Sequence, residues 1–62
     1  MSDFDIYWTF VTASKYGGSF YQAMANAGLA ADPDNKRRII DAFPKMVSCY
    51  GVDSKLHQEL RS

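Results

Sequence analysis

The chain is poor in cysteine and has no long hydrophobic run. Cys49 is the single cysteine among 62 residues, so no internal disulfide can form, and a short protein of an oxidising compartment would usually carry several cysteine pairs. No apolar run approaches the roughly 20 residues of a membrane-spanning helix. The acidic start of the chain lacks the basic region of a signal peptide. We therefore expect a soluble, cytoplasmic protein that retains Met1.

An excess of charge of one sign is also missing. Seven basic residues balance seven acidic ones, so the formal net charge is zero. Nucleic acids and anionic membranes attract proteins that present a positive field, and the chain as a whole offers none. A neutral chain also has little electrostatic protection against self-association.

Hydrophobic residues, by contrast, are abundant. They make up 47% of the chain, and aromatic residues make up 15%. This composition supplies a compact core and argues against disorder. At 62 residues the chain is expected to form one domain, residues 1–62, near the lower size limit for folding without a disulfide or metal.

The segment from about residue 3 to residue 16 is the most hydrophobic part of the chain. Four apolar residues in it follow helical spacing: Phe4, Tyr7, Trp8 and Val11. One narrow polar stripe remains, made of Ser2, Asp5, Thr9 and Thr12. A strand also fits the alternation of apolar residues, but no other segment offers a partner strand to satisfy its backbone. We predict a helix, with Ser2 or Asp3 as its cap.

Capping residues and helix breakers place the next two helices. A second helix is predicted over about residues 19–27, with Ser19 as its cap and Gly28 as its left-handed terminator. Asp32 followed by Pro33 is a strong start for a third helix. Its buried face would consist of Ile39, Ile40 and Phe43.

Pro44 ends or kinks this third helix, because proline lacks an amide hydrogen. A short helix then runs to Gly51, and Asp53 caps a last one in which Leu56 and Leu60 share a face. The expected fold is all-α, a small bundle of three to four short helices with the first packed across the others.

Three segments of the chain carry a resemblance. They are residues 16–23, 31–38 and 42–51, with the sequences YGGSFYQA, ADPDNKRR and AFPKMVSCYG. Together they resemble short orphan helical proteins encoded by bacteriophages and prophages, over roughly residues 7 to 51. The resemblance implies a stand-alone product of a phage or mobile element, and it identifies no site.

Catalytic and metal sites find little support in the sequence. One histidine, His57, and one cysteine, Cys49, cannot supply four zinc ligands. A nucleophilic site would need Cys49 activated by His57 and oriented by Asp53 or Glu59, and nothing in their spacing requires these residues to meet. We expect Cys49 to be a small, buried or half-buried residue and His57 an exposed one, and we expect no enzyme, cofactor or metal.

A basic cluster, Lys36, Arg37 and Arg38, is the candidate for nucleic-acid binding. A helix–turn–helix would place Gly28 in the turn, but the position six residues later holds Asp34, where an apolar residue is expected. Nearby aspartates cancel much of the positive field. We expect a solvated face with local Asp–Arg pairs, and keep nucleic-acid binding as the alternative function.

Aromatic residues are the candidates for a protein interface. Tyrosine and tryptophan dominate binding hot spots, and the proposed anchors are Tyr7, Trp8, Phe10 and Tyr21. The first helix could instead use all of its apolar surface to bury its neighbours. Protein–protein interaction is the expected function, with another protein or a second copy as partner.

Overall fold

A computed structural model describes residues 2–61 of the chain. Within these residues the fold consists of five short helices and no strand, which confirms the prediction of a small all-α bundle. They are α1 (Asp3–Tyr16), α2 (Ser19–Ala30), α3 (Pro33–Ala42), α4 (Pro44–Tyr50) and α5 (Lys55–Arg61). Met1 lies outside the described residues. No helix between residues 2 and 61 has the length and hydrophobicity needed to cross a bilayer.

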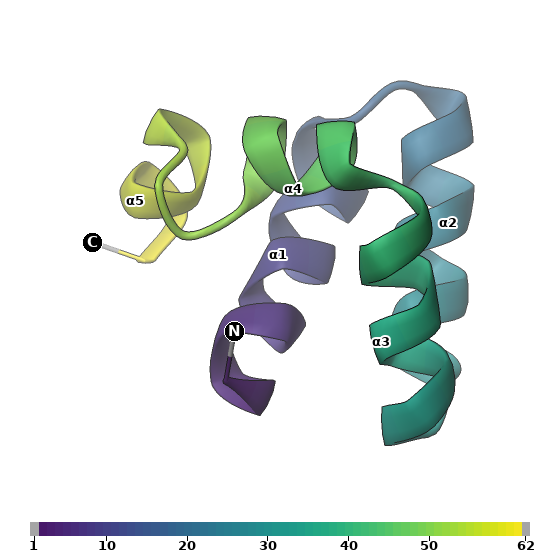
Figure 1. The fold of residues 1–62 in the computed structure, drawn as a ribbon. Helices are drawn as coiled ribbons and strands as arrows, with labels where there is room; N and C mark the ends of the chain where they lie inside the picture. Colours follow the sequence, from purple (N-terminus) through teal and green to yellow (C-terminus); the bar gives the residue numbers. More distant parts are fainter. Residues whose placement is uncertain (1, 62) are drawn as a thin grey trace.

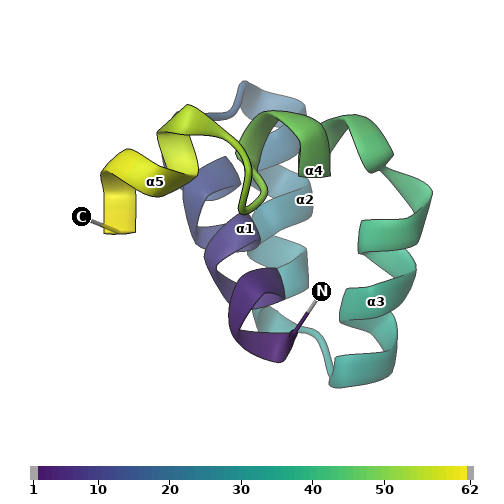
Figure 2. The same cartoon turned by 60° about the vertical axis from the view of Figure 1, so that its left-hand side comes forward.

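Helix α1 is the central element of the bundle. It contacts each of the other four helices, and its most extensive contact is with α2. Figure 1 shows that α2 runs antiparallel to α1, that α3 runs back beside α2, and that α4 crosses near the end of α1. Figures 1 and 2 both place α3 and α5 on opposite sides of α1. The prediction that the first helix packs across the others is confirmed.

The helix starts follow from local side-chain chemistry. The Ser2 hydroxyl accepts a hydrogen bond from the Asp5 amide, 3.1 Å away, and so caps α1 as predicted. The Asp32 carboxylate accepts from the Asn35 amide at 2.8 Å, with Pro33 at the first position of α3. These two bonds satisfy amide groups that have no partner inside their own helices.

Three predicted capping residues differ in the structure. Gly18, not Ser19, is the N-cap of α2, and that helix continues through Gly28 to Ala30. Gly28 therefore does not terminate the helix, and no residue between 2 and 61 has a positive φ angle. Ser54 replaces Asp53 at the start of α5, because the Ser54 hydroxyl accepts from the His57 amide at 3.1 Å.

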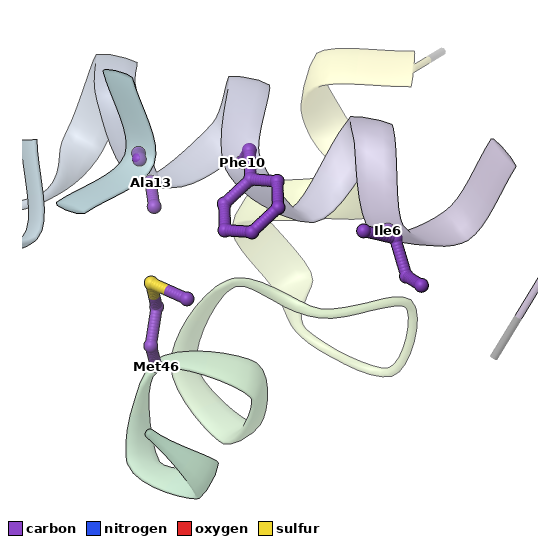
Figure 3. Packing of buried hydrophobic residues seen from close by; sticks show 5 residues of the cluster. Ile6, Phe10, Ala13 and Met46 are labelled. Carbon is purple, nitrogen blue, oxygen red and sulfur yellow. The ribbon is translucent and has the colours of Figure 1, made fainter. Parts of the chain in front are cut away.

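The core lies between α1, α2 and α4. Its buried hydrophobic residues are Ile6, Phe10, Ala13, Ala25 and Met46. Figure 3 shows the side chains of Phe10 and Met46 pointing toward each other from α1 and α4. Small residues at the crossing of α1 and α2 let the two backbones approach closely. Helix α3 packs more loosely: its predicted inward residues are half-buried, and none of its residues is fully buried.

Candidate protein-interaction surface

Helix α1 buries a different face from the one that its aromatic residues suggest. Its buried residues are Ile6, Thr9, Phe10, Thr12 and Ala13. The opposite side presents a stripe that we call the α1 outer face, which consists of Phe4, Tyr7, Trp8 and Val11. The strongest helical stripe of large apolar residues thus lies toward solvent, and the helix is turned with its threonines inward.

The burial of Thr9 and Thr12 corrects the predicted polar stripe. The Thr9 hydroxyl donates to the carbonyl oxygen of Asp5, and that of Thr12 donates to the carbonyl oxygen of Trp8, each at 2.7 Å. A hydroxyl that bonds within its own helix needs no partner from outside. Threonine can therefore present its methyl group to the core, and its small size suits the close packing there.

The α1 outer face is a continuous aromatic surface. Phe4 is 56% exposed and Tyr7 is 47% exposed, while Trp8 and Val11 are partly exposed. The ring of Trp8 makes edge-on contacts with both neighbours, with centroid distances of 6.2 Å to Phe4 and 5.7 Å to Tyr7. Edge-on ring contacts fix the orientation of the rings. The face therefore presents ordered aromatic groups to solvent.

The four predicted anchors do not form one site. Tyr7 and Trp8 lie together on the α1 outer face. Phe10 is fully buried in the core, so in this fold its side chain is not available to a partner. Tyr21 belongs to a separate cluster on α2. The sequence places residues 7, 8 and 10 close together, but rotation of about 100° per residue separates them around the helix.

Tyr21 is part of an aromatic cluster that joins α2 to α4. Its ring lies 5.3 Å from that of Phe20 and 6.0 Å from that of Tyr50, and Phe20 lies 5.6 Å from Phe43. Three of these rings are half-buried, whereas Phe20 is 56% exposed. Phe43 lies at the junction of α3 and α4, so the cluster includes this junction, and Phe20 is its exposed member. The sequence offered no signal for this grouping, because its members come from three segments.

The basic residues of α3 do not form a uniform positive surface. Lys36 is half-buried, whereas Arg37 and Arg38 are exposed, as predicted. Nη2 of Arg37 lies 2.7 Å from Oδ1 of Asp3, so this arginine pairs with α1 and not with a local aspartate. Both side chains are largely solvent-exposed, and water screens such a pair. Its main effect is to neutralise one of the three charges.

Shallow clefts follow the line along which α1 meets α3. One has a volume of about 250 Å³ and is lined by Ile6, Arg37, Ile40 and Asp41. A second of about 130 Å³ is lined by Asp3, Ile6, Pro33 and Lys36. Each is below the roughly 300 Å³ at which small-molecule pockets begin.

His57 is a core residue, which corrects the prediction that it is exposed. Its side chain is fully buried, and Nδ1 lies 2.9 Å from the carbonyl oxygen of Tyr50. A carbonyl can only accept, so Nδ1 carries the hydrogen and donates it. The bond satisfies a carbonyl at the end of α4, where helices leave such groups unpaired. His57 therefore holds α5 against α4.

Cys49 lies in a different environment from His57. Its side chain is exposed, contrary to the expected burial, because α4 turns Met46, Val47 and Tyr50 toward the bundle. Nδ1 of His57 bonds to a backbone carbonyl, and Nε2 is buried without a hydrogen-bond partner in the described part of the chain. Neither ring nitrogen thus holds the Cys49 thiol as a base would.

Metal-binding side chains do not gather in the described region. No group of three or more His, Cys, Asp or Glu residues suited to a metal ion occurs in it.

No protein-family model matches the chain, and comparisons with curated proteins and with solved structures find no match. The candidate site is therefore defined by the exposed residues of α1.

Proposed function

We propose that the protein is a small interaction module that occupies the surface of a protein partner with the α1 outer face. The partner is another protein or a second copy of the chain. The module acts in the cytoplasm as the product of a phage or mobile element, and it turns over no substrate. The resemblance of residues 16–23, 31–38 and 42–51 to phage and prophage proteins supports this origin.

The outward position of Tyr7 and Trp8 is the observation that carries the proposal. A chain of 62 residues has few large apolar side chains, and each one left in water forgoes about 1.5–3 kcal/mol of burial. Here two threonines occupy the core while the aromatic stripe lies outside. Contiguous exposed apolar surface marks interaction sites, and tyrosine and tryptophan are the residues that contribute most to binding.

Photo-crosslinking in bacterial cells tests this proposal. A photoreactive phenylalanine derivative at position 7 would lie on the α1 outer face, and the same group at position 20 is a matched control. Phe20 is aromatic and 56% exposed, compared with 47% for Tyr7, but it belongs to the other cluster. We expect a discrete adduct from position 7 and none from position 20. No adduct from position 7, or the same adducts from both positions, would contradict the proposal.

A further inference from the structure

Helix α5 is attached to the bundle through a histidine. Among residues 55–60, His57 is the one fully buried side chain, whereas Leu56 and Leu60 are half-buried. The helix lies at the edge of the bundle (Figure 2) and contacts α1 and α4. Its bond to α4 joins Nδ1 of His57 to the carbonyl oxygen of Tyr50. We propose that α5 is a pH-sensitive latch, which is docked at neutral pH and released when His57 takes up a proton.

The docked ring has room for one hydrogen only. Nδ1 donates its hydrogen to the Tyr50 carbonyl over 2.9 Å, and a neutral imidazole carries no second one. Nε2 therefore holds a lone pair, and it is buried without a hydrogen-bond partner in the described residues 2–61. A proton added at Nε2 would create a cation whose new N–H group meets neither an acceptor nor water. Burying such a charge is far more costly than burying a neutral polar group.

The end of α4 favours a positive ring, but this attraction is the weaker effect. Carbonyl groups at the C-terminus of a helix attract a cation, and a charged donor makes a stronger bond to the Tyr50 oxygen. Helix α4 has seven residues, so few peptide dipoles add up along it. The attraction of a helix end for a charge is smaller than the cost of removing an unpaired charge from water. The docked ring therefore stays neutral.

The charged side chains of the neighbouring elements do not offset a charge on Nε2. None of them is a hydrogen-bond partner of that atom in the part of the chain that the structure describes. Two of these titratable or charged residues, Asp5 and Tyr50, are partly buried, and the others are exposed. The full set consists of Asp3, Asp5, Tyr7, Lys15 and Tyr16 on α1, Lys45, Cys49 and Tyr50 on α4, Asp53 in the turn, and Lys55 and Glu59 on α5.

Detachment of α5 changes the protonation of the ring. In water an imidazole is half protonated at about pH 6.5, so the detached form takes up a proton that the docked form does not. Docking is therefore strongest above this pH and weakens as the pH falls below it. Between about pH 7.5 and about pH 5.5, the population of the detached form should rise roughly tenfold. The seven residues of α5 are too few to form a stable helix alone, so the detached segment should unfold.

Hydrogen exchange followed by NMR tests the latch in the unaltered chain. The probe is the Gln58 amide, which donates to the Ser54 carbonyl inside α5, and the reference is the Phe10 amide in α1. The protection factor corrects for the effect of pH on intrinsic exchange. That of Gln58 should fall roughly tenfold between about pH 7.5 and about pH 5.5, and it should stay below that of Phe10, because α5 opens without the bundle. An unchanged protection factor at Gln58, or equal protection of the two amides, would overturn the latch.

The chemical shifts of the two ring nitrogens test the protonation directly. At about pH 7.5 they should show the hydrogen of His57 on Nδ1 alone, as the bond to the Tyr50 carbonyl requires. A hydrogen on Nε2 of the docked ring, or a ring that becomes doubly protonated while Gln58 remains fully protected, would also overturn the proposal.

His57→Asn separates titration from packing. The asparagine amide can donate to the Tyr50 carbonyl in place of Nδ1, but it does not titrate. In this variant the protection of Gln58 should change by less than about twofold over the same pH range. A tenfold fall in the variant would show that another group causes the response and would overturn the role of His57. If the variant does not fold, the protection factors and the ring nitrogens of the unaltered chain decide the outcome.

Discussion

The ring of Phe10 occupies the place where a side chain at position 28 would begin. An ideal Cβ built on Gly28 would lie 2.5 Å from both Cε1 and Cζ of Phe10, well inside the contact distance of two carbon atoms. Glycine is needed here for close approach and not for backbone conformation, since its φ angle is not positive. This contact fixes how closely α2 lies against α1.

The first prediction concerns this contact. Gly28→Ala should lower the free energy of unfolding by about 1–3 kcal/mol, because the added methyl group overpacks the crossing of α1 and α2. The intrinsic preference of helices for alanine offsets only part of this cost. Chemical denaturation measures the change. Gly18→Ser is the control, because a Cβ at position 18 meets nothing within 4 Å and serine is a better cap.

A double variant tests the cause of that loss. Phe10→Leu removes the ring atoms that the new methyl group would meet, so the destabilisation of Gly28→Ala should be smaller in the Phe10→Leu background. If the two effects simply add, the cost at position 28 does not come from the Phe10 ring.

The second prediction concerns His57. Replacing it with alanine should cost about 2–3 kcal/mol of stability, through the cavity and the unpaired Tyr50 carbonyl that it leaves. An exposed residue would change stability by no more than about 0.5 kcal/mol. Thermal and chemical unfolding of His57→Ala distinguish these cases, with the exposed neighbour Gln58→Ala as the control. A small effect would contradict the role of His57 in holding α5.

The third prediction is that Cys49 has no catalytic role. Cys49→Ser should leave the free energy of unfolding within about 0.5 kcal/mol of the original, because the side chain is exposed. Adduct formation from position 7 should be unchanged as well. An activity that is seen when the protein is substoichiometric to its target, and that is lost in Cys49→Ser, would argue for an enzyme. It would argue against a module that acts by binding to a partner's surface.

The fourth prediction is weak or absent binding of nucleic acid. Arg37 is paired with Asp3, and the chain has no net charge, so labelled duplex and single strands should show little affinity at moderate salt. Fluorescence anisotropy at two salt concentrations measures it. Tight binding that weakens steeply with salt, and that disappears when Lys36, Arg37 and Arg38 are all replaced by glutamate, would favour the alternative function.

The starts of α1 and α3 could be predicted from the sequence because they depend on neighbouring residues. Ser2 and Asp32 each cap a helix through an amide three positions along the chain. Pro44 separates α3 from α4 because it lacks an amide hydrogen. Such signals act over a few residues and need no knowledge of the rest of the fold.

The orientation of α1 could not be predicted in this way. The helix carries one apolar stripe through Tyr7 and Trp8 and another through Ile6 and Phe10, and periodicity alone does not choose between them. The choice depends on what α2 presents, and its small residues favour the stripe that places Phe10 over Gly28. Threonine also counts as polar in a sequence pattern although its hydroxyl bonds within its own helix.

The contacts of His57 and Tyr21 are likewise tertiary. His57 meets a backbone carbonyl seven residues away, across a turn whose path the sequence does not specify. Tyr21 meets Tyr50 from a different helix. Of the four residues proposed as anchors, Tyr7 and Trp8 lie on one face, Phe10 is buried, and Tyr21 lies in a separate cluster.

The fluorescence of Trp8 tests most directly whether the α1 outer face is the contact surface. Trp8 is the single tryptophan of the chain and lies within that face. Collisional quenching of its fluorescence by acrylamide would be compared between the dilute chain and the complex it forms, either with a second copy at high concentration or with a captured partner. We predict that the complex protects Trp8 from quenching. Tyr7→Lys should abolish this protection while the helical circular dichroism spectrum persists. Equal quenching of Trp8 in the free chain and in the complex would contradict the assignment of the α1 outer face as the contact surface.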